Sequence, residues 1–394
     1  MAIISGVVRL LYGANCDWKN TLSLLREALR SAEDTDKEMS PSLNRDHLKP
    51  IQDAQIAPDA VNIAALIKEQ GHYIGDVTVS NLQRPEMGGS AGSLGFQASV
   101  NEGKGYEIRD FFIRFESMGE KAFKSYDFAG QFRTHQILAD TIVPVPPVLY
   151  LDPDGSTLGT PGFIMEKLEG EVPSDVYQTG VLGEASSEEQ RKMVFGVVET
   201  LANVHSLDWK ALGFEFLQPE DLRGETWFDH ELNRIWENIC WGCPERIPQA
   251  EPIYRWLLDN QPRDEEIVLN HGDANYTNFM FRDNNLIAAL DWEFACLGPR
   301  EFDLAFVLVV SGVLTIGQTA PPGFPTPEEI KAEYQLISGY QLCNWEYYCK
   351  KAYFSVAQRL WMGIRFFPPE KRIELDVRPN YCIDRILGRE PIAI

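Results

Sequence analysis

The sequence predicts an α+β chain in which a β-rich segment is followed by a longer, mostly helical one. Residues 74–115 contain strand-like apolar runs and a cluster of glycines, a texture typical of strands and tight turns. Beyond residue 169, apolar residues mostly recur at helical spacing. With 394 residues, 44% of them hydrophobic, the chain can bury a large core and divide into two lobes or domains. We expect a helical N-terminal extension over 1–70, an N-terminal lobe over 71–168 and a C-terminal lobe over 169–394.

The charge balance narrows the classes of partner. A formal net charge of −22 argues against a nucleic-acid surface, which needs a basic footprint, and favours a neutral or cationic substrate over a polyanionic one. The N-terminus lacks the features of a secretory signal, and the longest apolar stretch, residues 304–316, is too short to span a bilayer. Seven cysteines, an odd number, indicate reduced thiols. We therefore expect a cytoplasmic protein without nucleic-acid or membrane partners, and its oligomeric state cannot be predicted from the sequence.

Residues 1–70 have a helical texture. Leu22, Leu25 and Leu29 recur at helical spacing, whereas residues 31–50 are polar and predict a loop. A second helix is expected to begin near Pro58, because proline suits the first turn of a helix, and to end before Gly71.

Residues 77–100 predict two strands joined by a glycine-rich turn over residues 88–95. Glycine lacks a Cβ, so the backbone N–H groups of such a turn can approach a phosphate closely. Gly88, Gly89 and Ser90 are therefore candidate contacts to a nucleotide. A plain hairpin loop explains the same glycines equally well.

A further strand is expected over 107–115 and places Arg114 among apolar neighbours. A guanidinium there is costly unless it is paired or lies against phosphate oxygens. The alternative is an edge strand whose arginine points into solvent. A helix is expected to follow over 128–139.

Residues 162–170 predict a buried strand that runs out into a glycine, Gly170. This strand is either a hinge, with the backbone from Glu166 to Leu168 hydrogen-bonding an adenine, or an ordinary core strand.

Most of the remaining chain predicts helices. The segments are residues 193–205, 227–240, 253–258, 304–316 and 347–366, and Thr326 is expected to cap one more. His205 is better explained as a core histidine than as a catalytic one. Cys240 and Cys243 have the spacing of a redox or metal pair, but no second pair stands at zinc-site spacing, so we interpret them as structural.

The stretch 267–293 carries the chemistry. An apolar strand ends at His271-Gly-Asp273, Asn278 follows five residues after that aspartate, and Asp291 ends the second strand of the next hairpin. A carboxylate that orients a hydroxyl, with an amide and a second carboxylate as hard oxygen ligands, is the set that Mg²⁺-dependent phosphoryl transfer needs. The alternative is that Asp273 and Asn278 only form turns.

These motifs resemble the aminoglycoside phosphotransferase and choline kinase-like family, which has a bilobal protein-kinase-like fold. The closest branch includes the kinase-like domains fused to some acyl-CoA dehydrogenases. The matching segments are His271-Gly-Asp273 with Asn278, Asp291-Trp-Glu293, residues 297–305, residues 162–170 and residues 201–209. The combination is specific, although each short segment alone is not.

The resemblance implies an ATP-dependent kinase acting on a small-molecule hydroxyl. Asp273 would be the catalytic base or hydroxyl-orienting residue, braced by His271, and Asn278 and Asp291 would hold Mg²⁺. Arg114 would take the place of the strand lysine that meets the nucleotide phosphates. It further implies that Gly88, Gly89 and Ser90 cover the nucleotide, that Glu166 to Leu168 form the hinge, and that Asp303 supports the catalytic loop.

Two departures from the family pattern leave alternatives open. Thr134 stands where a helix normally supplies a glutamate for the strand cation, so either another acid such as Glu116 or Asp127 pairs with Arg114 or the phosphate-positioning apparatus is weakened. In addition, Ser-Ala-Gly-Ser follows the first glycines where Ser-Asn is usual. The alternative function is therefore a nucleotide-binding pseudokinase or scaffold, with a metal-dependent hydrolase as a weaker third. The acceptor is either aminoglycoside-like or a hydroxyacyl-type compound.

Overall fold

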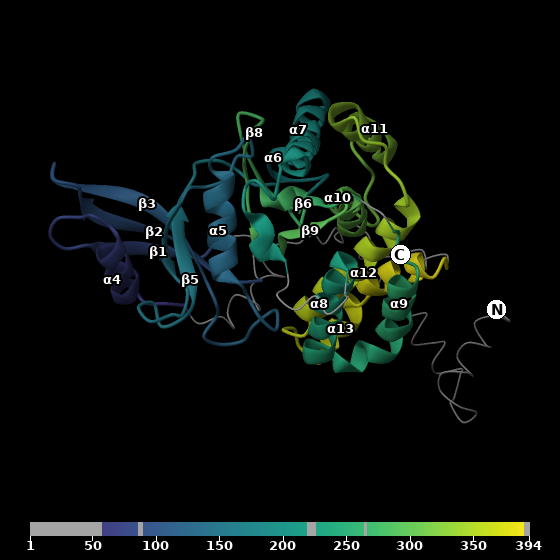
Figure 1. Ribbon diagram of the computed structural model, residues 1–394, viewed down its shortest axis with the longest axis horizontal. Helices are drawn as coiled ribbons and strands as arrows, with labels where there is room; N and C mark the ends of the chain where they lie inside the picture. The colour runs from purple at the N-terminus through teal and green to yellow at the C-terminus, as the bar shows by residue number, and fades with distance from the viewer. Residues whose placement is uncertain (1–56, 86–89, 219–225, 264–265, 390–394) are drawn as a thin grey trace, which may run out of the picture. The chain divides into compact units, whose positions relative to one another are not determined.

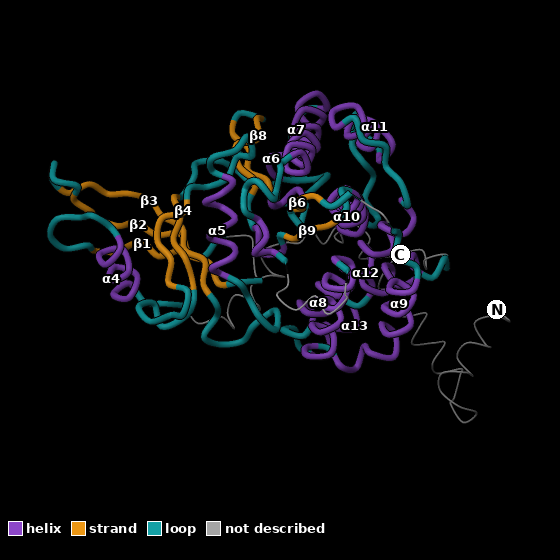
Figure 2. The backbone as a smooth tube through the Cα atoms, viewed as in Figure 1, coloured by secondary structure: helices purple, strands orange, loops and turns teal. Residues whose placement is uncertain are grey.

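The computed structural model describes residues 57–85, 90–218, 226–263 and 266–389, all within one compact unit over residues 42–394. Figure 1 shows strands β1 to β5 with helices α4 and α5, followed by a mostly helical part, and Figure 2 shows the same division by colour. The predicted α+β organisation, with strands concentrated in the N-terminal lobe, is confirmed. Across these ranges, no helix combines the length and the apolar character that crossing a membrane requires.

The N-terminal lobe is built on a five-stranded antiparallel sheet in the order β1-β2-β3-β5-β4. Its strands are β1 (Thr78–Gln83), β2 (Gly92–Asn101), β3 (Tyr106–Phe115), β4 (Val148–Asp152) and β5 (Gly162–Glu166). Because β3 pairs with both β2 and β5, it is an inner strand. The edge-strand alternative for Arg114 is therefore wrong.

Two helices pack on this sheet. α4 (Ala60–Gln70) begins after Asp59, whose side chain accepts a hydrogen bond from the Asn62 amide, and buries three aliphatic side chains in one core with β2 and β3. α5 (Phe128–Leu138) packs with Phe163 and Met165 in a second core. Since Ile164 belongs to the α4 core, the alternation along β5 assigns the two helices to opposite faces.

The glycine-rich turn is shorter than the sequence predicts. β2 begins at Gly92, so Gly92 and Gly95 pair within the sheet and do not belong to the turn. A Cβ on Gly92 would lie 2.2 Å from the Phe115 ring, so this glycine permits close cross-strand packing. Gly88 and Gly89 lie outside the described residues, and Ser90 comes two residues before β2.

The C-terminal lobe combines helices with two small two-stranded sheets. The helices are α6 (Gly180–Gly183), α7 (Ser187–Ser206), α8 (Trp227–Gly242), α9 (Ile247–Asp259), α10 (Glu301–Leu314), α11 (Pro327–Ser338), α12 (Trp345–Ile364), α13 (Pro369–Leu375) and α14 (Val377–Ile386). β6 (Val268–Asn270) pairs with β9 (Cys296–Gly298), and β7 (Phe279–Arg282) pairs with β8 (Asn285–Ala289). The helices expected from sequence in this lobe are confirmed, with boundaries that differ by a few residues. The helix expected around Leu22, Leu25 and Leu29 lies outside the described residues.

α10 is the central helix of this lobe. Its side chains contribute to one core shared with α8, α9, α12 and α14 and to another shared with α7 and α11. This explains the uninterrupted apolar run that the sequence shows there. Thr326 caps α11 through a reciprocal hydrogen-bond pair with Glu329, as its position before a proline predicts.

Candidate active site

The loop after β6 is tied down by a buried aspartate on α10. Asp303 accepts hydrogen bonds from the backbone amides of His271, at 2.7 Å, and Gly272, at 2.8 Å. Gly272 has a φ of +78°, and a Cβ there would lie 1.8 Å from the carbonyl oxygen of Phe294. The loop can follow this path only with glycine at position 272.

His271 is buried and hydrogen-bonded within the protein at both ring nitrogens. Its ring is fully buried, and its Nε2 lies 2.8 Å from the carbonyl oxygen of Leu290. A carbonyl oxygen can only accept, so Nε2 carries the proton and Nδ1 accepts from the Asp273 amide at 3.3 Å. The histidine thereby links the end of β8 to the turn that presents Asp273.

Asp303 is itself held by a second buried histidine. His205 contacts the Asp303 carboxylate at 3.2 Å through Nε2 and the Tyr334 hydroxyl at 2.7 Å through Nδ1. Burial alone would raise the pKa of Asp303, but the hydrogen bond from His205 and the neighbouring histidine rings hold that pKa below its ordinary value. His205 therefore has the structural role that the sequence favoured.

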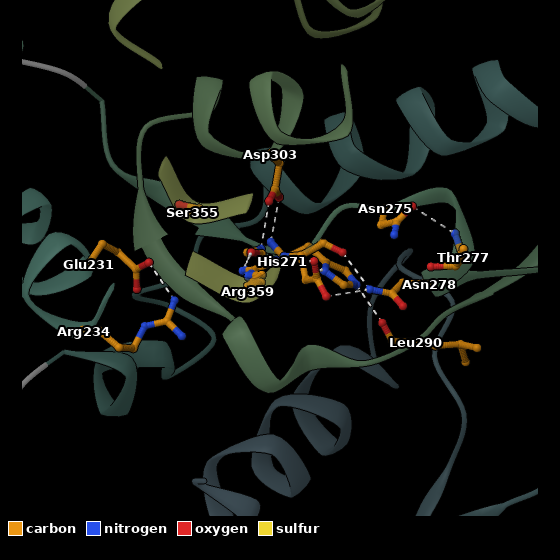
Figure 3. A network of polar contacts seen from close by, with 12 residues as sticks. Glu231, Arg234, His271, Asn275, Thr277, Asn278, Leu290, Asp303, Ser355 and Arg359 are labelled. Carbon is orange, nitrogen blue, oxygen red and sulfur yellow. Dashed lines mark hydrogen bonds and ion pairs between the residues drawn. The ribbon is translucent and has the colours of Figure 1, made fainter. Parts of the chain in front are cut away.

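The carboxylate of Asp273 is fixed from two sides, by Asn278 and by Arg359, which are both labelled in Figure 3. Asn278 donates through Nδ2 to Asp273 Oδ2 at 3.0 Å and to the Asp273 carbonyl at 2.8 Å. Arg359, on α12, forms an ion pair with Asp273 Oδ1 and donates to the Gly272 carbonyl at 2.8 Å. Because Asn278 uses its nitrogen here, its side-chain oxygen remains for another ligand.

Asp291 lies beside Asn278 at the end of the β7–β8 hairpin. The amide of Leu290 donates to the Asn278 carbonyl at 2.8 Å, which joins the two segments. Asp291 has a left-handed backbone, with φ of 61°, a conformation that costs a non-glycine residue about 1 kcal/mol. Asp273 and Asn278 are thus joined directly by hydrogen bonds, and the Leu290 amide holds the segment that carries Asp291 next to Asn278.

Arg114 is buried and paired, but neither of the acids expected from sequence pairs with it. Its guanidinium lies 2.8 Å from Asp291 and 3.1 Å from Glu293. Burial would lower the pKa of Arg114, and these two carboxylates raise it. The expectation that Glu116 or Asp127 pairs with Arg114 is wrong, because Glu116 pairs with Lys121 and the Asp127 side chain caps α5.

Glu293 is the partner that the sequence did not identify. Its side chain is 3% exposed. Burial and the charge of Asp291 raise the pKa of Glu293 to about 8, against the lowering effects of Arg114 and of a hydrogen bond with Ser90. Ser90, the described member of the predicted nucleotide turn, therefore lies beside Glu293, which pairs with Arg114.

The predicted hinge lies at the end of β5. The amide of Glu166 donates to the Pro147 carbonyl at 2.9 Å, and its carboxylate pairs with Arg109 at 3.3 Å. Within the described ranges, the backbone N–H and C=O of Leu168 form no hydrogen bond with the chain. Leu168 therefore offers a free donor and acceptor, as a purine contact requires.

The sequence pattern of the phosphotransferase enzyme family matches residues 103–328. The chain belongs to this family. Acyl-CoA dehydrogenase family member 11 of Pongo abelii is 29% identical over 268 residues, which cover 64% of this chain and 33% of that protein. The probable acyl-CoA dehydrogenase IBR3 of Arabidopsis thaliana is 26% identical over 318 residues, covering 73% of this chain and 38% of that protein. The chain thus spans roughly a third of the length of these relatives.

Solved structures of aminoglycoside phosphotransferases and of an ethanolamine kinase have the same fold as this chain. A Ralstonia eutropha protein described as a candidate aminoglycoside phosphotransferase has a TM-score of 0.63 at 20% identity, with 84% of this chain and 98% of that chain covered. An ethanolamine kinase from Plasmodium vivax has a TM-score of 0.52 at 12% identity, with 82% and 84% covered. A mutant of aminoglycoside phosphotransferase APH(4)-Ia, in complex with ADP and hygromycin B, has a TM-score of 0.50 at 15% identity, with 83% and 99% covered. These likenesses confirm the kinase-like bilobal fold.

A second set of buried charges, which the sequence did not reveal, lies near the candidate site. Buried Glu231 pairs with Arg234 at 2.8 Å, and the ammonium group of Lys351 lies 3.7 Å from the centre of the Phe302 ring. Burial would raise the pKa of Glu231, but Arg234 and Lys351 hold it at about 2. Burial lowers the pKa of Lys351. Figure 3 shows Glu231 and Arg234 in the same view as Arg359.

Arg234 and Glu293 also line a cavity of about 150 Å³. Its other walls are residues 123–127 before α5, Glu237 and Asn238 of α8, and Phe294. The cavity therefore lies directly beside the acidic pair that holds Arg114. Among the described residues, no cluster of three or more His, Cys, Asp or Glu side chains is arranged to hold a metal ion.

Proposed function

We propose that this chain transfers the γ-phosphoryl group of ATP, in the presence of Mg²⁺, to a hydroxyl group of a small molecule. The observation that carries the proposal is the hydrogen-bonded pair of Asp273 and Asn278 on a braced loop, next to the end of the hairpin that carries Asp291. Phosphoryl transfer depends mainly on positioning and on electrostatic stabilisation, and this arrangement supplies both.

Asp273 would orient the acceptor hydroxyl. The acceptor oxygen forms a bond to the γ-phosphorus, the bond from that phosphorus to the bridging oxygen breaks with its electron pair leaving on ADP, and the hydroxyl proton passes to Asp273. Arg114 would contact the nucleotide phosphates with Glu293 behind it. The Leu168 backbone would contact the adenine, and Gly88, Gly89 and Ser90 would cover the phosphates.

The donor set fits Mg²⁺. The free side-chain oxygen of Asn278 and the Asp291 carboxylate are hard ligands, and Mg²⁺ commonly takes only one or two protein ligands together with phosphate oxygens and waters. When bound, Mg²⁺ would neutralise charge on the phosphate oxygens as the transfer proceeds.

For the acceptor, the hydroxyacyl type fits the site better than the aminoglycoside type. An aminoglycoside carries several positive charges, and Arg359 pairs with Asp273 at the point where its hydroxyl would react. The names of the relatives, which are acyl-CoA dehydrogenases, support an acyl compound. We further propose a cytoplasmic location, because the six described cysteines are all free thiols.

The test is Mg²⁺-dependent ATP turnover, measured alone and with amino-sugars, hydroxyacyl thioesters and sterol-like alcohols as acceptors. Asp273→Asn and Asp291→Ala should lower turnover by about 100-fold or more. Asp376→Asn is the matched control. Asp376 lies between α13 and α14 and, like Asp273, pairs with an arginine, Arg246. Turnover that persists in Asp273→Asn would contradict the proposed role of Asp273.

A nucleotide-binding protein without transfer activity remains the second candidate. The observation in its favour is that the candidate metal ligand Asp291 and the candidate catalytic Asp273 are both paired with arginines, Arg114 and Arg359 respectively. If ATP binds, as measured by calorimetry, and no acceptor supports turnover, this second function replaces the first.

A further inference from the structure

Arg359 reaches the catalytic loop from a helix far along the chain. It lies on α12, 86 residues after Asp273, among buried apolar neighbours such as Val356, Ala357 and Met362. A charged side chain is rare at such a position unless it has a buried partner. Its partners are the Asp273 carboxylate and the Gly272 carbonyl, so the guanidinium spans both the side chain and the backbone of the loop.

Two aromatic rings fix the plane of this guanidinium. Its central carbon lies 4.1 Å from the centre of the Phe294 ring and 4.4 Å from that of Phe306. Phe294 follows closely after Asp291, and Phe306 lies on α10 one turn after Asp303. The cation is therefore held by the two segments that also carry the proposed metal ligand and the loop anchor.

The remaining bond to the Asp273 side chain comes from Asn278. With Arg359 on Oδ1 and Asn278 on Oδ2, both carboxylate oxygens have a fixed direction. Without Arg359, the 3.0 Å contact to Asn278 alone would leave the carboxylate free to turn about that bond. A hydroxyl-orienting residue depends on this direction.

We propose that Arg359 is a positioning residue for Asp273 in the phosphoryl transfer proposed above, on which this inference rests. The guanidinium acts through the Asp273 carboxylate and sets the direction in which that carboxylate meets the acceptor hydroxyl. It should therefore affect kcat, with little effect on the KM for ATP.

The test compares Arg359→Ala, Arg359→Lys and the wild type in Mg²⁺-dependent ATP turnover. Arg359→Ala should lower kcat by about 100-fold, the effect of misplacing a reacting group by about 1 Å, and change the KM for ATP by less than about threefold. Arg359→Lys keeps the charge but not the planar fork, so its kcat should fall between the two. Guanidinium ion at millimolar concentration should restore part of the activity of Arg359→Ala, because Phe294 and Phe306 still frame the vacated space.

Arg246→Ala is the matched control. Arg246 also pairs with an aspartate, Asp376, and lies over an aromatic ring, Trp361, but it does not contact the catalytic loop. A kcat for Arg359→Ala at or above that of Arg246→Ala, in folded protein, overturns the proposal. If Arg359→Ala does not fold, Arg359→Lys decides, and a kcat equal to the wild type overturns the proposal.

Crystal structures of the wild type and Arg359→Ala separate this inference from the proposed function. The variant should show an Asp273 carboxylate that has turned about its 3.0 Å contact to Asn278. An unchanged carboxylate overturns the positioning role. Absence of ATP turnover in the wild type would instead refute the proposed phosphoryl transfer, and the two structures would still decide whether Arg359 positions Asp273.

Discussion

Replacing Glu293 by glutamine tests the electrostatics of the buried group around Arg114. Glutamine has nearly the same shape as a protonated glutamate and keeps an oxygen that can accept from Arg114, 3.1 Å away. It removes only the ability to ionise. Any difference between the two proteins that changes with pH therefore reports on the Glu293 carboxylate.

The structure sets the sign and the size of this difference. The pKa of Glu293 rises from its ordinary value of 4.5 to about 8, so between these values the folded protein keeps a proton that the unfolded chain has released. The free energy of unfolding of the wild type should therefore fall as the pH rises, by at most about 1.4 kcal/mol per pH unit. Over the whole interval, the loss can reach about 5 kcal/mol. Glu293→Gln lacks this contribution, so it should match the wild type near pH 5 and be the more stable protein at pH 8.

The assay is urea unfolding followed by circular dichroism at half-unit steps from pH 5 to pH 9. Glu237→Gln is the control, because Glu237 lines the same cavity but is 60% exposed and pairs with Lys124 at the surface. The control should keep the pH slope of the wild type. Parallel slopes for Glu293→Gln and the wild type would refute the reasoning.

Three further predictions concern the loop and the metal. Gly272→Ala should lower the free energy of unfolding, measured by thermal unfolding, by at least about 2 kcal/mol, because φ at position 272 is +78° and the new Cβ would overlap the Phe294 carbonyl. The control Gly312→Ala, which places its Cβ in open space on α10, should leave this stability unchanged or raise it slightly. Equal effects of the two substitutions would contradict this account. Asp303→Asn should lower the free energy of unfolding in urea by about 3 kcal/mol, because the asparagine side chain cannot accept hydrogen bonds from both loop amides as the carboxylate does. The control is Asp384→Asn, at a more exposed aspartate that pairs with Arg389, and an equal loss of stability in the two variants would contradict the prediction. Removing Mg²⁺ with excess EDTA should reduce ATP turnover to background, and added Mg²⁺ should restore it; turnover that survives EDTA would exclude the proposed use of Asn278 and Asp291.

The sequence predicted those features that depend on local pattern. The strands and helices follow from residue spacing, and the Asp273, Asn278 and Asp291 set follows from a single short stretch that folds as a loop and a hairpin. Even so, the strand boundary at Gly92 was wrong. Gly92 lies in β2 and allows the Phe115 ring of β3 to pack closely against it. The local sequence does not distinguish a glycine with this packing role from a glycine in a turn.

Features that depend on long-range contacts could not be predicted in the same way. The partners of Arg114 lie on the loop after β8, far from it in the sequence. Glu116 and Asp127 are acids close to Arg114 in the sequence, and sequence proximity alone favoured them. Glu293 was visible in the Asp-Trp-Glu motif, but only the packed structure shows that it pairs with Arg114. Arg359 gave one signal, a cation within an apolar stretch of helix, but its partner lies 86 residues away.

The ion pair between Arg114 and Asp291 has a thermodynamic consequence for ligand binding. In the free protein, the arginine that would meet the nucleotide already neutralises the carboxylate that would meet the cation. A nucleotide that attracts Arg114 weakens this pair and frees Asp291, and a cation on Asp291 releases Arg114. The two ligands should therefore bind cooperatively, and linkage requires each to strengthen the binding of the other by the same factor.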